Sequence, residues 1–158
     1  MTTEPNGPYI DVQVVCSARD IPTQGQLANW VAAALPADQR HSELTVRIVE
    51  PSESQQLNAD YRGKDRATNV LSFPSDLPDY IDEPLLGDLV ICASVVQHEA
   101  TEQQKPLEAH WAHMVVHGTL HLLGYDHIND DDAHEMESLE AHILNGLGYP
   151  NPYDDPEG

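Results

Sequence analysis

The feature that most constrains this chain is the run of residues 117–127, which reads HGTLHLLGYDH. His117 and His121 are four residues apart, so on a helix they share one face about 6 Å apart along the axis, and both imidazoles can reach one metal ion. Gly124 follows within a turn and can take the left-handed conformation that ends helices. The chain can therefore turn back at Gly124 and bring His127 toward the other two histidines.

Three imidazoles at this spacing predict a site for one metal ion. Three protein ligands leave a tetrahedral position open for water, which is typical of catalytic zinc sites, whereas structural zinc sites are closed by four ligands and often contain cysteine. Neither Cys16 nor Cys92 lies near the motif. The sequence does not identify the ion, since imidazole also suits nickel, copper and iron. Histidines that lie on a helix without binding metal are the alternative, which the glycine break and the third histidine disfavour.

The same spacing is found in the metzincin metallopeptidases, which place a glutamate general base directly after the first histidine. Here that position is Gly118. A metzincin-like peptidase is therefore an alternative function that lacks its usual base.

The acidic composition restricts how the chain can bind polyanions. The 158 residues contain 27 acids against 7 lysines and arginines, and the resulting formal net charge of -20 argues against broad electrostatic binding of nucleic acid. Arg62, Lys64 and Arg66 nevertheless place three of the seven basic residues within five positions. We predict that these three residues form a phosphate-facing, substrate-binding patch; a solvated turn after a helix is the alternative.

Length and hydropathy predict a single domain over residues 1–158, with residues 1–8 and 150–158 flexible. The sequence has no 18-residue apolar run, and its N-terminus lacks the features of a signal peptide. We therefore expect a cytoplasmic protein with no membrane partner. Cys16 and Cys92 lie in apolar runs and are expected to be reduced core residues.

Periodic patterns predict a mixed four-stranded sheet and about five helices. Strands are expected at 9–16, 44–48, 68–73 and 86–92, the last of them central because it is apolar on both faces. Helices are expected at 23–35, 52–61, from 94, at 106–123 and from 129 or 130 to 147. The strand–helix–strand order favours parallel pairing of the first two strands, and the irregular loop at 75–84 favours antiparallel pairing of the last two. Three helix starts are predicted from capping boxes, at Thr23 with Gln26, Ser52 with Gln55, and Ser94 with Gln97.

The helix at 106–123 is predicted to bury one apolar face and to carry histidines on the other. The histidine face holds His110, His113, His117 and His121. His110 and His113 could support the metal ligands or contact substrate, but we favour histidines that are exposed or satisfied in the core. The three aspartates at 130–132 are expected from the dipole of the next helix rather than as metal ligands.

Three segments together resemble the bacterial YbeY family of endoribonucleases. They are residues 61–74, which read YRGKDRATNVLSFP, then Leu86-Gly87-Asp88, and the histidine segment at 117–127. The resemblance runs from about residue 44 to Tyr149 and includes the spacing between the segments.

The resemblance implies a zincin-like α+β fold and a single-strand-specific, metal-dependent endoribonuclease that is usually described as zinc-binding. It places the metal ligands at His117, His121 and His127 and the functional arginine at Arg62. It also implies action in the 3′-end maturation of small-subunit (16S) ribosomal RNA and in ribosome quality control. The expected partners are ribosomal RNA, the small ribosomal subunit and ribosome-associated proteins.

The basic cluster and the metal motif suggest which residues would have which role in such a reaction. Arg62 would stabilise negative charge on the phosphate, because its planar guanidinium matches two phosphate oxygens, and Lys64 and Arg66 would contact the substrate. A non-enzymatic alternative is a metal-stabilised assembly factor that binds the ribosome without cutting RNA.

Overall fold

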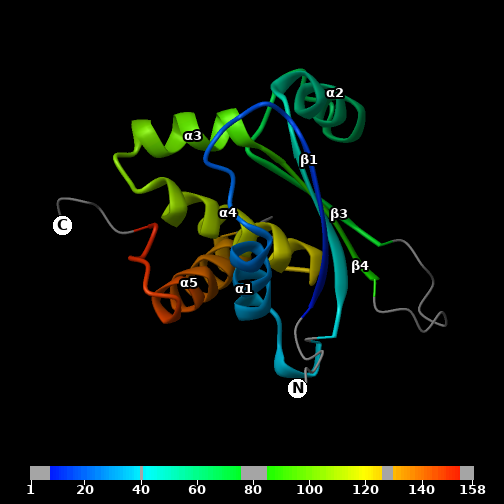
Figure 1. Cartoon of the computed structure of the whole chain (residues 1–158). Helices are drawn as coiled ribbons and strands as arrows, with labels where there is room; N and C mark the ends of the chain where they lie inside the picture. The colour runs from blue at the N-terminus through cyan, green and yellow to red at the C-terminus, as the bar shows by residue number, and fades with distance from the viewer. Residues whose placement is uncertain (1–7, 40, 76–84, 126–129, 154–158) are drawn as a thin grey trace.

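A mixed four-stranded sheet forms the centre of the computed structural model, which describes residues 8–39, 41–75, 85–125 and 130–153 (Figure 1). Its strands are β1 (Tyr9–Val15), β2 (Glu43–Val49), β3 (Val70–Pro74) and β4 (Leu85–Cys92), in the order β1-β2-β4-β3. β1 and β4 both pair in parallel with β2, whereas β3 pairs antiparallel with β4. The predicted parallel and antiparallel pairings and the central position of residues 86–92 are thus confirmed.

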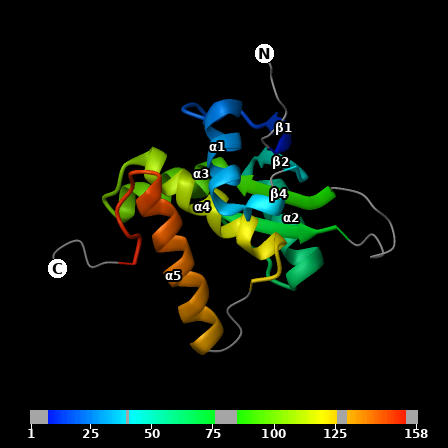
Figure 2. The same cartoon turned by 90° about the horizontal axis from the view of Figure 1, so that it is seen from below.

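Five α-helices surround the sheet in the described part of the chain, as the sequence predicted. They are α1 (Gln24–Ala34), α2 (Pro51–Arg62), α3 (Ala93–Glu102), α4 (Leu107–Leu122) and α5 (Asp130–Gly146), with a short 3-10 helix at Ala37–Gln39. The helices α1, α4 and α5 lie on one side of the sheet, and α2 lies on the other (Figures 1 and 2). This arrangement confirms the α+β fold class.

The alternation of side chains along each strand supplies two separate cores. In β4, Leu89 and Ile91 belong to the large cluster under α1 and α4, whereas Val90 and Cys92 belong to a small cluster under α2. Successive strand residues point to opposite faces, so a central strand must be apolar on both. The large cluster fixes α4 against the sheet, which matters because α4 carries the histidines.

One of the three predicted capping boxes is confirmed and two are wrong. Thr23 Oγ1 accepts the N–H of Gln26 at 3.1 Å, and Gln26 Oε1 accepts the N–H of Thr23 at 2.9 Å. The helix α2 instead begins at Pro51 without a side-chain cap, so Ser52 does not cap it; proline suits this position because it lacks the N–H that would stay unbonded. The predicted cap at Ser94 is also wrong, since β4 runs directly into α3 at Ala93.

Both cysteines are free, as predicted; Cys92 is buried and Cys16 is half-buried. No helix in the described ranges is both long and apolar enough to cross a membrane. The loop predicted at 75–84 lies outside the described residues from 76 onward, as do the cap position at 129 and the tails at 1–7 and 154–158. Tyr153, within the segment 150–158 that was predicted to be flexible, is described and contacts His113.

Candidate metal and phosphate site

The helix α4 crosses the sheet so closely that one of its positions has room only for glycine. A Cβ added to Gly118 would lie 2.7 Å from Cδ2 of Leu89 and 3.2 Å from Cγ2 of Val70, and the Ser72 hydroxyl donates to the Gly118 carbonyl at 3.2 Å. The backbone of the helix therefore packs directly on the side chains of the strands at this point. The contact places His117 and His121, on either side of Gly118, beside β3.

The end of α4 forms the glycine turn that the sequence predicted. Gly124 has φ 105°, its N–H donates to the His121 carbonyl at 3.0 Å, and the Tyr125 N–H donates to the Leu120 carbonyl at 3.0 Å. These two bonds are the Schellman arrangement, which needs a left-handed residue such as glycine. The turn also brings the Tyr125 carbonyl to Nδ1 of His121 at 3.0 Å. The third predicted ligand, His127, lies outside the described residues.

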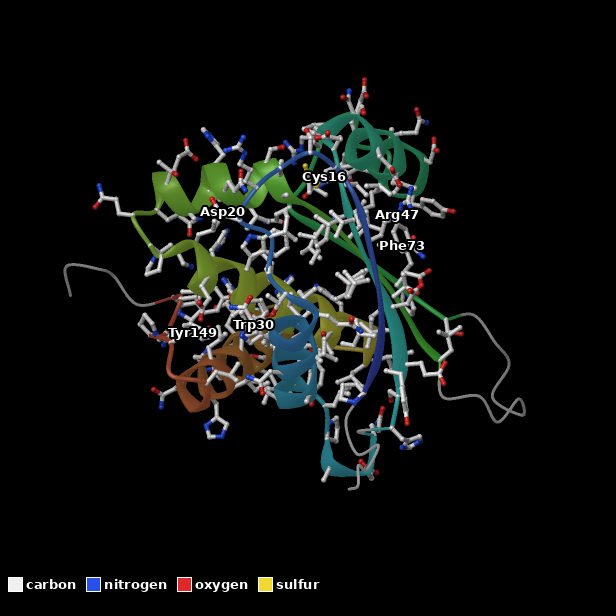
Figure 3. The ribbon with its side chains drawn as sticks, in the orientation of Figure 1. Cys16, Asp20, Trp30, Arg47, Phe73 and Tyr149 are labelled. Atoms are coloured by element: carbon white, nitrogen blue, oxygen red, sulfur yellow. The ribbon has the colours of Figure 1, made fainter. Side chains whose placement is uncertain are left out.

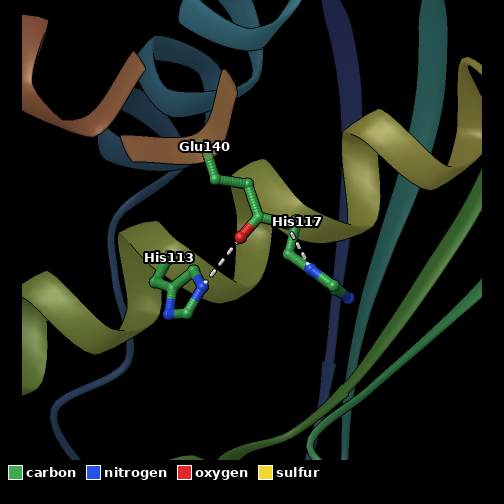
Figure 4. A group of neighbouring side chains, drawn as sticks. All are labelled: His113, His117 and Glu140. Atoms are coloured by element: carbon green, nitrogen blue, oxygen red, sulfur yellow. Dashed lines mark hydrogen bonds and ion pairs between the residues drawn. The ribbon is translucent and has the colours of Figure 1, made fainter. Parts of the chain in front are cut away.

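A buried carboxylate from α5 fixes the orientation of His117. Oε2 of Glu140 lies 2.5 Å from Nδ1 of His117, and Oε1 lies 3.1 Å from Nε2 of His113 (Figure 4). The Tyr153 hydroxyl also donates to Oε1. Glu140 is fully buried, at 0% exposure, so its charge depends on these donors.

Electrostatics agree with an ionised Glu140. Burial alone would raise the pKa of this carboxyl, but the hydrogen bonds from His113, His117 and Tyr153 outweigh it and lower the pKa to about 2. Conversely, burial lowers the pKa of His113, although Glu140 partly offsets the effect. Both Nδ1–H of His117 and Nε2–H of His113 can thus donate to one carboxylate.

A pocket of about 630 Å³ brings Arg62 together with the two histidines of α4. Arg62 is the last residue of α2, and His117 and His121 of α4 line the same pocket, with ring centroids 4.6 Å apart. Tyr61, residues 68–69, strand β3 and the turn at Gly124 complete the lining. Lys64 and Arg66 are exposed and do not line this pocket. The structure therefore unites three of the predicted site residues and leaves two outside.

Two sets of donor atoms in this region could bind a divalent ion. One consists of His113, His117 and Glu140, and the other contains the Nε2 atoms of His117 and His121. The donor atoms of His113, His117 and Glu140 lie within 4.8 Å of one another and could hold a metal ion. However, two ligands of one tetrahedral zinc stand about 3.3 Å apart, given bonds of about 2.0–2.1 Å, and 2.5 Å between His117 and Glu140 is much shorter. In this arrangement Glu140 accepts a hydrogen bond from Nδ1–H of His117 rather than sharing an ion with it. Because Nδ1 is engaged in both His117 and His121, Nε2 is the nitrogen through which each ring would bind an ion.

Sequence reasoning found the histidines but missed their acidic partners. His110 and His113 are buried, and the favoured interpretation of both as satisfied core histidines holds only in part. Nε2 of His110 bonds Glu99 at 2.9 Å and Nε2 of His113 bonds Glu140, whereas Nδ1 of each ring is buried without a hydrogen-bond partner among the described residues. The sequence pattern singles out neither Glu99 nor Glu140, and it places Tyr153 in a flexible tail. One signal was available, since Glu140 stands between Met136 and Leu144 on the buried face of α5. A charged residue at the centre of an apolar stripe needs partners, and histidines are suitable ones.

The fold and the site together define a small α+β protein whose central helix presents a zincin-like histidine pair to a pocket that also holds an arginine. The chain belongs to the YbeY family, since the family model described as endoribonuclease YbeY matches residues 15–148. Membership supports an endoribonuclease role in ribosomal RNA processing. The chain is also similar to a solved structure, the solution structure of TM1509 from Thermotoga maritima. The identity is 25% with a TM-score of 0.55, over 96% of this chain and 99% of that one.

Proposed function

We propose that this chain is a metal-dependent, single-strand-specific endoribonuclease that acts in the 3′-end maturation of 16S ribosomal RNA and in ribosome quality control. The observation that supports it most directly is the shared pocket of Arg62, His117 and His121 in a chain of an endoribonuclease family. Imidazole and guanidinium side chains that line one pocket suit a phosphodiester. The imidazoles would bind it through a cation, and the guanidinium would bind it by direct contact.

The donor chemistry fits Zn²⁺, and it also suits nickel or another divalent ion. His117, His121 and His127 would hold the ion, with Glu140 and the Tyr125 carbonyl setting the ring orientations of the first two. When bound, such an ion supplies Lewis-acid polarisation of a phosphoryl oxygen and a lowered pKa for water. This chemistry reduces the need for the carboxylate base that metzincins carry at the position of Gly118.

Arg62 binds the phosphate in this proposal. It ends α2, and Gly63 follows with φ 71° as the left-handed residue that closes the helix. Arg62 itself lines the pocket. Its planar fork can donate to two phosphate oxygens and stabilise the charge that develops during phosphodiester cleavage. Lys64 and Arg66 would contact the RNA farther along its backbone, outside the pocket.

Two other functions are less well supported. A metzincin-like peptidase needs a glutamate after its first histidine, and a side chain at Gly118 would run into Leu89 and Val70. A non-catalytic assembly factor would bind the ribosome without needing Arg62 beside the histidines. The proposed partners are ribosomal RNA, the small ribosomal subunit and ribosome-associated proteins in the cytoplasm, bound locally because the net charge is -20.

Elemental analysis combined with a nuclease assay tests the proposal. Wild-type protein should contain one divalent ion per chain and cut a single-stranded RNA but not the same sequence within a duplex. His121→Ala should lose the ion and the activity, whereas Arg62→Ala should keep the ion and lose the activity. Cleavage of a denatured protein substrate instead of RNA would favour the peptidase. Full nuclease activity in metal-free protein would refute the proposed chemistry.

A further inference from the structure

An exposed aromatic ring stands beside the candidate site and has no role in the proposal above. Tyr61 precedes Arg62 in the last turn of α2, and its side chain is 68% exposed. Its ring meets Phe73 of β3 edge to face, with centroids 4.9 Å apart and planes at 66°. Phe73 packs against the small core under α2, so it anchors the Tyr61 ring while leaving much of that ring open to solvent.

The aromatic pair, Tyr61 and Phe73, forms the boundary between two pockets. Both residues line the pocket that holds Arg62 and the histidines, and both also line a neighbouring pocket of about 840 Å³. The second pocket extends over the face of the sheet beside α2, where Figure 3 places Arg47 close to Phe73. A ligand bound at Arg62 can therefore extend across the aromatic pair into the second pocket.

The chemistry of the second pocket differs from that of the first. Arg47 is the one lysine or arginine among the described residues that line it, and its guanidinium is bound to Glu53 at 2.6 Å and 3.2 Å and to Gln13 at 2.9 Å. Asp88 adds a further acid at its edge. A phosphate would be repelled or unpaired there, whereas the apolar wall with amide and hydroxyl groups suits an uncharged planar group.

We propose that Tyr61 and Phe73 form a stacking subsite for the base of an unpaired nucleotide, next to the phosphate that Arg62 binds. The inference rests on the proposed function and adds a second contact for its substrate. Proteins recognise single-stranded RNA by stacking splayed bases on aromatic side chains, and this contact does not depend on net charge. A base held in a duplex must first unpair and unstack before it can stack on Tyr61, at a cost of about a few kcal/mol. The subsite thus gives a physical reason for preference for single strands in an acidic protein.

The test removes either the ring or the base and measures the Michaelis constant. The substrate is a short single-stranded RNA whose cut site has been mapped with the wild-type protein, together with two versions that lack one base, on the nucleotide 5′ or 3′ of the cut. Tyr61→Leu should raise KM for the intact RNA by about 5- to 150-fold, the usual range for loss of one stacked base. Tyr61→Phe, which keeps an aromatic ring, should raise KM much less than Tyr61→Leu does.

Coupling between the two changes identifies the stacked nucleotide. One abasic RNA should bind the wild type as weakly as the intact RNA binds Tyr61→Leu, and on that RNA Tyr61→Leu should add less than about a twofold further loss. Tyr9→Leu is a matched control, because Tyr9 is 51% exposed and lines neither pocket. Circular dichroism of each variant verifies folding, and the abasic RNAs test the subsite with unaltered protein.

The outcomes separate this inference from the proposed function. An unchanged KM for Tyr61→Leu, or an equal loss on all three RNAs, would overturn the stacking subsite while metal-dependent cleavage stood. A wild-type protein that cuts none of the RNAs would overturn the proposed function and the subsite with it.

Discussion

Replacing Glu140 with glutamine tests whether this buried carboxylate orients a metal ligand. The change keeps the size of the side chain, but it replaces one acceptor oxygen by an NH₂ donor. Hydrogen-bond donors of His113, His117 and Tyr153 converge on the two carboxylate oxygens of Glu140. A glutamine side chain has only one acceptor oxygen, so it cannot accept at both positions. The His117 ring would then have to move or place its proton on Nε2, the nitrogen through which it would bind the ion.

The expected effect is a weaker metal site that is still present. Loss of an outer carboxylate–histidine contact typically lowers metal affinity by about 10- to 100-fold, which corresponds to about 1.4–2.7 kcal/mol of binding free energy. Competition between full-length protein and a chelator for Zn²⁺ measures this change directly. The visible spectrum of the Co²⁺-loaded protein reports whether the ligand set is preserved. Glu135→Gln is the control, since Glu135 is an exposed residue of the same helix.

Two results would contradict the reasoning. Unchanged affinity in Glu140→Gln would show that the hydrogen bond to His117 does not matter for the ion. Complete loss of the ion, as deep as in His121→Ala, together with an altered Co²⁺ spectrum, would instead make Glu140 a ligand within the set formed with His113 and His117.

Three further predictions concern catalysis, packing and pH. Arg62→Ala should lower turnover by about 100-fold or more without changing metal content, because it removes a charged donor at the phosphate; equal turnover in a single-turnover assay would contradict this. Gly118→Ala should lower the free energy of unfolding by about 1–3 kcal/mol in urea, since its Cβ would lie 2.7 Å from Leu89, whereas Gly146→Ala, with open space around it, should not. Burial would raise the pKa of Glu99, but the hydrogen bonds from His110 and Asn69 lower it below 4.5, so its contribution to stability is present above that pH and is lost as the pH falls through the lowered value. Unfolding midpoints between pH 6 and pH 3 should therefore fall less steeply in Glu99→Gln than in wild type, and parallel curves would refute the assignment.

The strand pairing was predictable only in part because sequence patterns are local. Alternating apolar residues located all four strands, and the double-faced run at 86–92 identified a central one. The position of β4 between β2 and β3 could not be predicted, because local sequence patterns do not determine which strands pair with each other. The small core shared by Leu71, Val90 and Cys92 stabilises that order, and it exists only after the strands have come together.

The two wrong capping boxes have a common cause. A Ser followed by Gln three residues later occurs often by chance, and it caps a helix only if the Ser has an extended backbone. At α2 the chain is already helical at Pro51, and at α3 it is helical at Ala93, one residue before each expected cap. Thr23 does have an extended backbone, with ψ 163°, and its box forms. The pattern is therefore informative only together with what precedes it.

The histidine face of α4 shows most clearly what sequence reasoning could not supply. The helical period places His110, His113, His117 and His121 along one side, but nothing in that spacing divides them into a core pair and a pocket pair. The division depends on acids from elsewhere in the chain, since Glu99 of α3 holds His110 and Glu140 of α5 bonds both His113 and His117.

Glu140 therefore stands at the border between core and site. Its charge is stable in the interior because ring N–H groups from both regions donate to it. An ion bound at Nε2 of His117 would hold the ring in the tautomer that donates to Glu140, so metal binding and folding should support each other. We expect added Zn²⁺ to raise the unfolding temperature of wild-type protein more than that of Glu140→Gln, measured at equal free Zn²⁺ concentration. An equal rise of the unfolding temperature in both proteins would show that the carboxylate stabilises the core but does not affect metal binding.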